Sequence, residues 1–167
     1  ISYGAGTWER PDWSVFDVVG LDAYRDAANR WRFPDDIRST VTGHHADGRP
    51  VYIFEFGTCA YRGSAARSSQ ASSVLRERRG HLTVPTSLAR DEQEQAGYID
   101  ELLDDFVAAG VDGVFVYGFS EPVLTQSEVP GRDLDLASYG VVAVQPNGDR
   151  RRKLAFHLIA RRYGGNP

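Results

Sequence analysis

The chain has 167 residues, of which 41% are hydrophobic and 11% aromatic. This length and composition suit one globular unit with a sizeable core, and we expect residues 1–167 to form a single domain unit. The formal net charge is only −4, which excludes the strongly basic surface typical of nucleic-acid partners. The one basic run, from Arg150 to Lys153, is expected at the solvated start of a helix.

Several other classes of site are also excluded. The apolar stretches are interrupted within about ten residues, too short to cross a bilayer, so no membrane partner is predicted. Cys59 is the only cysteine, so neither an internal disulfide nor a cysteine-based zinc site can form. His44 and His45 lie in a polar connection and are expected at the surface, and Gly4-x-Gly6 lacks the rest of a dinucleotide-binding loop. We expect no metal and no cofactor.

The start of the chain gives no targeting information. It opens at Ile1-Ser2-Tyr3 and contains no methionine. We therefore expect a piece of a longer protein, and neither a cytoplasmic nor a secreted location is predicted.

Four continuous apolar segments predict parallel strands covered on both faces. They are residues 1–8, 16–24, 49–57 and 111–119. A helix is predicted over residues 91–109, because Ala96, Ile99, Leu102, Leu103, Phe106 and Val107 recur at steps of three and four, with Gly110 as its stop. A second helix is predicted over residues 152–163, before Gly164-Gly165.

This order of strands and helices predicts an α/β fold with a parallel sheet. Two long polar segments, residues 62–85 and 120–135, follow the third and fourth strands. Long loops after the carboxyl ends of parallel strands are usually functional. Residues 139–144, closed by a Pro-Asn-Gly turn, predict a short extra strand.

The most informative segment is the third strand, which is apolar and then ends in Glu55-Phe56-Gly57. An ionised side chain at that position has to be paired, hydrated or used in chemistry. In a barrel it would point into the cleft, where it could attack an anomeric carbon or stabilise a developing positive charge. The alternative is an ion pair with Arg25 or Arg62.

Residues 16–24, 49–57 and 113–119 resemble strands six, seven and eight of retaining glycoside hydrolases with the TIM-barrel fold. A closer resemblance is to actinobacterial glycosidase-like barrel proteins often labelled abortive infection proteins. The matching segments are Trp8-Glu9 with Asp12-Trp13-Ser14, Asp22-Ala23-Tyr24-Arg25-Asp26, Glu55-Phe56-Gly57 with Tyr61-Arg62-Gly63, and Asp133-Leu134-Asp135 with Ala137-Ser138-Tyr139-Gly140-Val141-Val142. The last two groups are the most specific.

The resemblance implies a (β/α)8 TIM barrel, of which this chain forms the C-terminal portion, about strands five to eight. It implies that Glu55 is the nucleophile of a protein that hydrolyses O-glycosidic bonds of a carbohydrate substrate. The acid/base glutamate of these hydrolases follows strand four, in the absent N-terminal half. Since a retaining mechanism needs both groups, we expect this chain alone to be inactive.

Other side chains are candidates for binding the sugar. Asp22 and Tyr24 end the preceding strand, where the tyrosine hydroxyl could hydrogen-bond Glu55. The remaining predicted substrate-binding residues are Trp8, Tyr61, Arg62, Tyr117 and Phe119, and Trp31 is a further aromatic candidate. Glu9 and Glu121 are weaker candidates for a second carboxylate. Most aromatic side chains are core and most loop glutamates are solvated, so each has a structural alternative.

Two other functions remain open at this point. The same cleft could hold a glycan without cleaving it, since fold does not determine activity. The label of the resembling group suggests an interaction or phage-defence component. In either case four βα units cannot close a barrel of eight strands, so self-association through the open edges is expected of a true fragment.

Overall fold

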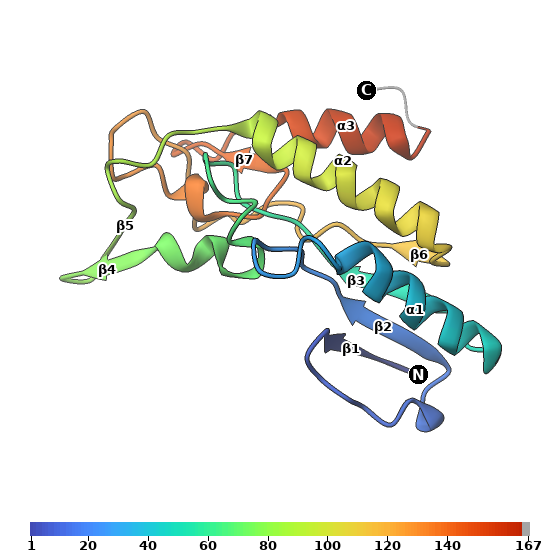
Figure 1. Ribbon diagram of the computed structural model, residues 1–167. Coiled ribbons are helices and arrows are strands. Elements are labelled where there is room, and N and C mark those ends of the chain that lie inside the picture. Colours follow the sequence, from blue (N-terminus) through green and yellow to red (C-terminus); the bar gives the residue numbers. More distant parts are fainter. Residues whose placement is uncertain (165–167) are drawn as a thin grey trace.

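The computed structural model describes residues 1–164 and shows a parallel sheet with helices packed along one side (Figure 1). The sheet has the order β1-β2-β3-β6, and each neighbouring pair is parallel. Its strands are β1 (Ser2–Gly6), β2 (Val18–Asp22), β3 (Val51–Glu55) and β6 (Gly113–Val114). The α/β prediction is confirmed, with strands shorter than the apolar segments that predicted them.

Three α-helices accompany the sheet: α1 (Phe33–Ala46), α2 (Glu92–Ala109) and α3 (Leu154–Arg162). Both predicted helices are confirmed, residues 91–109 as α2 and residues 152–163 as α3. Helix α2 begins after Asp91, whose side chain accepts a hydrogen bond from the Glu94 amide. It ends at Gly110, whose φ of 79° is the left-handed conformation that favours glycine. Val107 was expected on the buried face but is 74% exposed, because it lies about 100° around the helix from Phe106.

The main core lies between the helices and one face of the sheet. Alternate residues of the strands point into it, because side chains along a strand alternate between faces. The strands contribute Val19, Leu21, Val51 and Ile53, and the helices contribute Ile37, Val41, Ile99, Leu102 and Phe106. The Phe106 ring packs edge-on against Phe56, with centroids 5.0 Å apart. Each such buried side chain contributes roughly 1.5–3 kcal/mol to folding.

Two short hairpins and three 3-10 helices complete the described part. The hairpins pair β4 (Arg76–Arg78) with β5 (His81–Thr83), and β7 (Val142–Val144) with β8 (Arg150–Arg152), both antiparallel. The 3-10 helices are Trp13–Val15, Ser68–Val74 and Leu134–Ala137. The predicted extra strand is β7. The basic run was expected at a solvated helix start, but its first three residues form β8 after the turn, and its last residue, Lys153, is buried at the N-cap of α3.

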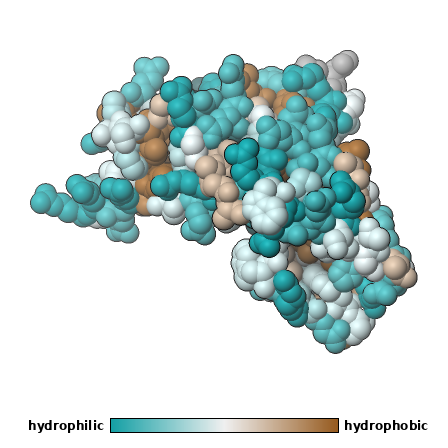
Figure 2. Space-filling view, viewed as in Figure 1, coloured by the Kyte–Doolittle hydropathy of each residue, from teal (hydrophilic) through white to brown (hydrophobic). Residues whose placement is uncertain are grey.

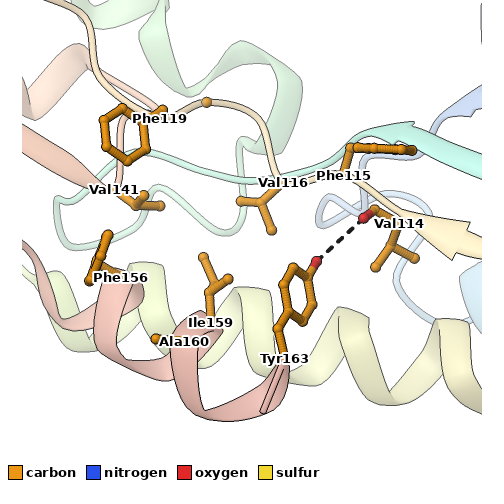
Figure 3. A pocket seen from close by; sticks show the side chains of 10 residues that line it. Val114, Phe115, Val116, Phe119, Val141, Phe156, Ile159, Ala160 and Tyr163 are labelled. Atoms are coloured by element: carbon orange, nitrogen blue, oxygen red, sulfur yellow. Dashed lines mark hydrogen bonds between the residues drawn. The ribbon is translucent and has the colours of Figure 1, made fainter. Parts of the chain in front are cut away.

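The described sheet is a partial barrel, since β1 and β6 each pair on one side only. Beside the β6 edge, an apolar groove of about 340 Å³ runs between residues 114–119 and α3. Figure 3 shows Val116, Ile159 and Tyr163 around this space, with the Tyr163 hydroxyl donating to the Val114 carbonyl at 3.4 Å. The face turned away from the helices carries Phe54, packed over Gly20 and beside Phe115. Among the described helices, none is long and apolar enough to cross a bilayer.

Candidate active site

Glu55 is the last residue of β3, and it lies at the carboxyl edge of the sheet beside the end of β2. Its register partner is Asp22, and its carbonyl accepts a hydrogen bond from the Ala23 amide at 2.8 Å. The Tyr24 hydroxyl donates to Glu55 Oε2 at 3.2 Å. The structure therefore brings together three of the residues that the sequence placed at strand ends.

The surroundings of Glu55 are acidic and partly buried. Burial, followed by the negative charge of Glu55, raises the pKa of Asp22. Burial also raises the pKa of Tyr24, with the Glu55 charge as the next cause, so Tyr24 remains a protonated donor. Within the described residues Glu55 forms no ion pair.

The two arginines considered as its partners are engaged elsewhere. Arg25 pairs with Glu101 and Asp105 on α2. Arg62 Nε lies 3.6 Å from Asp91 Oδ2. The ion-pair alternative for Glu55 is therefore not realised in the structure.

Gly57 explains why a glycine follows the Glu-Phe pair. A Cβ at this position would lie 2.4 Å from the carbonyl oxygen of Tyr117, which is backbone and cannot simply turn aside. The same contact region contains the hydrogen bond from the Tyr117 amide to the Phe56 carbonyl, 2.9 Å long. The glycine thus lets the chain after β6 approach the end of β3.

That approach creates a row of three tyrosines beside Glu55. Tyr117 packs edge-on against Tyr139 with ring centroids 5.6 Å apart, and Tyr139 packs edge-on against Tyr24 at 6.2 Å. Burial raises the pKa of Tyr117, with smaller contributions from the charges of Glu121 and Glu55. Tyr139 was not predicted as a site residue, although it lies in one of the segments that carry the family resemblance.

Tyr139 is held by contacts from three directions. Its hydroxyl donates to the Ser68 carbonyl at 2.6 Å, and its amide donates to Glu121 Oε1 at 2.9 Å. The buried Gln95 side chain donates from Nε2 to the Thr58 and Tyr139 carbonyls, at 2.9 and 3.3 Å. The segments after β3 and β6 are therefore joined through one residue of α2.

Two further side chains of α2 hold the segments after β2 and β3. The Tyr98 hydroxyl donates to the Arg25 carbonyl at 2.8 Å, accepts from the Arg25 amide at 2.9 Å, and lies 2.7 Å from Ser68 Oγ. The Glu94 carboxylate accepts from the amides of Gly63 and Ala65. These contacts fix the chain after β2 and the chain after β3, the strand that carries Glu55.

A buried ionic cluster supports the segment that carries Tyr139. Asp135 Oδ1 lies 2.9 Å from Lys153 Nζ, and Asp135 Oδ2 accepts from Arg90 Nη1 at 2.8 Å. Arg90 also binds both carboxylate oxygens of Asp133, at 2.7 and 2.8 Å. Burial lowers the pKa of the Lys153 ammonium, and burial raises the pKa of the neighbouring Cys59 thiol.

The other predicted substrate-binding residues fall into two groups. Trp8, Arg62, Tyr117 and Phe119 are exposed on segments that follow the carboxyl ends of strands. Tyr61 is only 2% exposed, and its hydroxyl donates to the Ala71 carbonyl at 2.9 Å. The Tyr61 ring belongs to a second core cluster under the long loop, so we do not retain it as a sugar contact.

The remaining candidates have local roles. Trp31 is exposed just before α1. The Glu9 carboxylate accepts from the Gly6 amide and the Tyr3 hydroxyl. His44 and His45 lie in the last turn of α1, where His45 Nε2 is 2.8 Å from Asp112 Oδ2. Within residues 1–164 no group of three or more His, Cys, Asp or Glu side chains could hold a metal ion.

Comparison with known proteins gives the fold class. No protein-family model and no curated protein sequence matches this chain. Among solved structures it is similar to a GH113 β-1,4-mannanase, with a TM-score of 0.55 and 19% identity over 84% of this chain. A GH1 β-glucosidase from Exiguobacterium antarcticum B7 also matches 88% of the chain, at 14% identity and a TM-score of 0.46.

The likeness to the mannanase supports a partial α/β barrel as the fold of this chain. The chain spans 40% of the length of the mannanase and 34% of that of the β-glucosidase. At these identities the likeness extends to the fold alone.

Proposed function

We propose that this chain is the C-terminal portion, about strands five to eight, of a retaining glycoside hydrolase in which Glu55 is the nucleophile. The observation that carries the proposal is the Tyr24 hydrogen bond to Glu55 Oε2, at the carboxyl edge of the sheet. A carboxylate that has no ion-pair partner in the described part of the chain is unlike a structural charge. The fold shared with the mannanase supports the class of activity.

In this mechanism the free oxygen of Glu55 attacks the anomeric carbon of the bound sugar. The glycosidic oxygen leaves with a proton from the acid/base carboxyl, and a glycosyl ester of Glu55 forms. Water, deprotonated by the same acid/base group, then attacks the anomeric carbon and releases Glu55. The Tyr24 hydroxyl occupies Oε2 and so orients Oε1 toward the sugar.

We assign the acid/base group to a part of the barrel outside these 167 residues. A retaining pair needs carboxyl groups roughly 5–5.5 Å apart across the scissile bond. The two loop carboxylates considered in this chain are committed elsewhere, because Glu9 accepts from Gly6 and Tyr3, and Glu121 accepts from the Tyr139 amide. Their local hydrogen bonds favour structural roles.

The sugar rings would lie on the exposed aromatic side chains of the carboxyl edge. Trp8 and Tyr117 present apolar faces there, and Asp22 offers a carboxylate beside Glu55. Phe119 is also exposed, and it lines the groove between residues 114–119 and α3. Arg62 is exposed on the loop after β3 and completes the proposed contacts.

The test uses the intact enzyme that contains this chain. Glu55→Gln keeps the shape of the side chain and removes its charge, so we expect turnover of aryl glycosides, β-mannosides included, to fall by more than about 10³-fold with binding retained. Glu101→Gln, on the exposed face of α2, is the matched control and should keep full activity.

A second variant identifies the role of Glu55 directly. In Glu55→Gly, added azide should restore turnover and give a glycosyl azide of inverted configuration, because azide enters where the nucleophile stood. Activity of Glu55→Gln near that of wild type would overturn the assignment. A wild-type protein that binds the glycosides without any turnover would instead support a binding-only barrel.

A further inference from the structure

A basic groove of about 490 Å³ lies between the β4–β5 hairpin and residues 130–132. This volume is within the range of roughly 300–1,000 Å³ typical of small-molecule sites. Its charged lining consists of Arg76, Arg78 and Arg132, and hydroxyl groups come from Thr83, Thr86 and Ser87. No carboxylate is among the residues that line it.

The hairpin turns two arginines toward the same side. Arg76 and Arg78 are two positions apart on β4, so their side chains share one face, and Glu77 points to the other. The turn between the strands is Arg79-Gly80, with φ values of 52° and 77°. A two-residue turn of this kind usually has Asn or Asp at its first position. Arg79 therefore adopts a positive φ that is unfavourable for its side chain.

The three groove arginines have no ion-pair partner within residues 1–164. Other arginines of the same structure are paired, for example Arg90 with Asp133 and Arg162 with Asp100. The chain has more acidic than basic residues, with a net charge of −4. Three unpaired guanidinium groups around one groove therefore repel each other and favour an anionic ligand.

The groove belongs to the same edge of the sheet as Glu55. The hairpin is part of the long segment after β3, and residues 130–132 are part of the segment after β6. The Val84 amide donates to the Gly131 carbonyl at 3.1 Å and joins the two segments. Figure 1 shows the hairpin projecting beyond the strands, and its surface is mostly hydrophilic in Figure 2.

We propose that this groove binds acidic residues of the substrate, so that the preferred glycan carries carboxylate or sulfate groups. The proposal rests on the proposed glycosidase function, which it extends to a substrate class. Guanidinium groups bind both anions with paired hydrogen bonds. Nucleic acid fits less well, because single strands need aromatic side chains for base stacking, and the lining contains none.

The experiment measures binding to the 167-residue chain by calorimetry at 50 and 200 mM salt. The probes are tetragalacturonate, a κ-carrageenan tetrasaccharide, uncharged mannotetraose and a single-stranded RNA octamer. We expect one or both acidic oligosaccharides to bind, more weakly at high salt, and the tighter of the two identifies the preferred anionic group.

The variants remove the guanidinium charge and keep a polar side chain, although a shorter one. Each of Arg76→Gln, Arg78→Gln and Arg132→Gln should weaken binding about two- to fivefold, and the triple variant by about tenfold or more. Arg161→Gln, an exposed arginine at the end of α3, is the matched control and should leave affinity unchanged. Circular dichroism confirms that each variant folds.

Unchanged binding in the triple variant, equal affinity for mannotetraose, or tighter binding of the RNA would each overturn the inference. Since the assay needs no turnover, its failure leaves the assignment of Glu55 untouched. Conversely, if Glu55 proved not to be the nucleophile, binding of acidic oligosaccharides in the groove would be unaffected.

Discussion

Removing the charge of Asp135 should destabilise the chain far more than removing the charge of its partner Lys153. Asp135 is 1% exposed and touches two cations, Lys153 at 2.9 Å and Arg90 at 2.8 Å. Asp135→Asn leaves the Lys153 ammonium, which is 0% exposed, without its anion. Breaking a buried ion pair in this way costs about 3–5 kcal/mol.

Lys153→Met has a different expected cost. Asp135 keeps its contact with Arg90, and the desolvated ammonium is removed altogether. We expect a change within about 1 kcal/mol of wild type in either direction. The double variant Asp135→Asn/Lys153→Met should recover most of the stability lost in Asp135→Asn.

Urea unfolding followed by circular dichroism measures these differences at a fixed protein concentration. Asp104→Asn, in an exposed ion pair with Arg162, is the control and should cost no more than about 1 kcal/mol. Lys153→Met could instead destabilise the chain as much as Asp135→Asn does. That result would refute the argument that Arg90 alone is a sufficient partner for Asp135.

The pH dependence provides a second measurement on the same variants. Burial lowers the pKa of Lys153 below its ordinary value of 10.5. Between the lowered pKa and 10.5 the unfolded chain binds more protons than the folded chain, so stability should rise with pH in that window. Lys153→Met should remove this rise.

Three further outcomes are expected. Gly57→Ala should lower the midpoint of thermal unfolding, because its Cβ would lie 2.4 Å from the Tyr117 carbonyl; an unchanged midpoint would mean that the two segments separate easily. The 167-residue chain alone should release no phenol from a panel of aryl glycosides, and turnover that disappears on substituting Glu9 or Glu121 would relocate the acid/base group to this chain. Light scattering should show association with a second copy through the unpaired edges of β1 and β6, and a stable monomer at all concentrations would contradict that expectation.

Much of the sheet could be predicted because its signals are local. Each parallel strand is a continuous apolar segment, and the placement of Glu55 beside Tyr24 follows from two strands ending at one edge. Helix α1 was not predicted individually, since only Phe33, Ile37 and Val41 are buried in an otherwise polar segment. Its end signals were present, with Pro34 in the first turn and histidines in the last.

The site residues that escaped prediction depend on contacts between distant segments. Asp135 and Lys153 form a buried pair only because the β7–β8 hairpin brings them together. The position of Tyr139 depends on a hydrogen bond to Ser68, 71 residues away. Tyr61 is an aromatic residue in the segment after β3, as a sugar contact would be, yet the following loop folds over it and buries its ring. No local pattern contains this information.

The contacts made by Glu94, Gln95 and Tyr98 have a consequence for motion. One helix face anchors the chain after β2, the chain after β3 and the chain after β6 by side-chain hydrogen bonds. Loops held in this way belong to the same cooperative unit as the helix, and their protected amides exchange with solvent only when that unit opens. We therefore expect slow amide exchange along the edge that carries Glu55. The residues of the β4–β5 hairpin are mostly exposed, and beside it the Val84 amide donates to the Gly131 carbonyl, so we expect the hairpin amides to exchange faster than the rest of that edge.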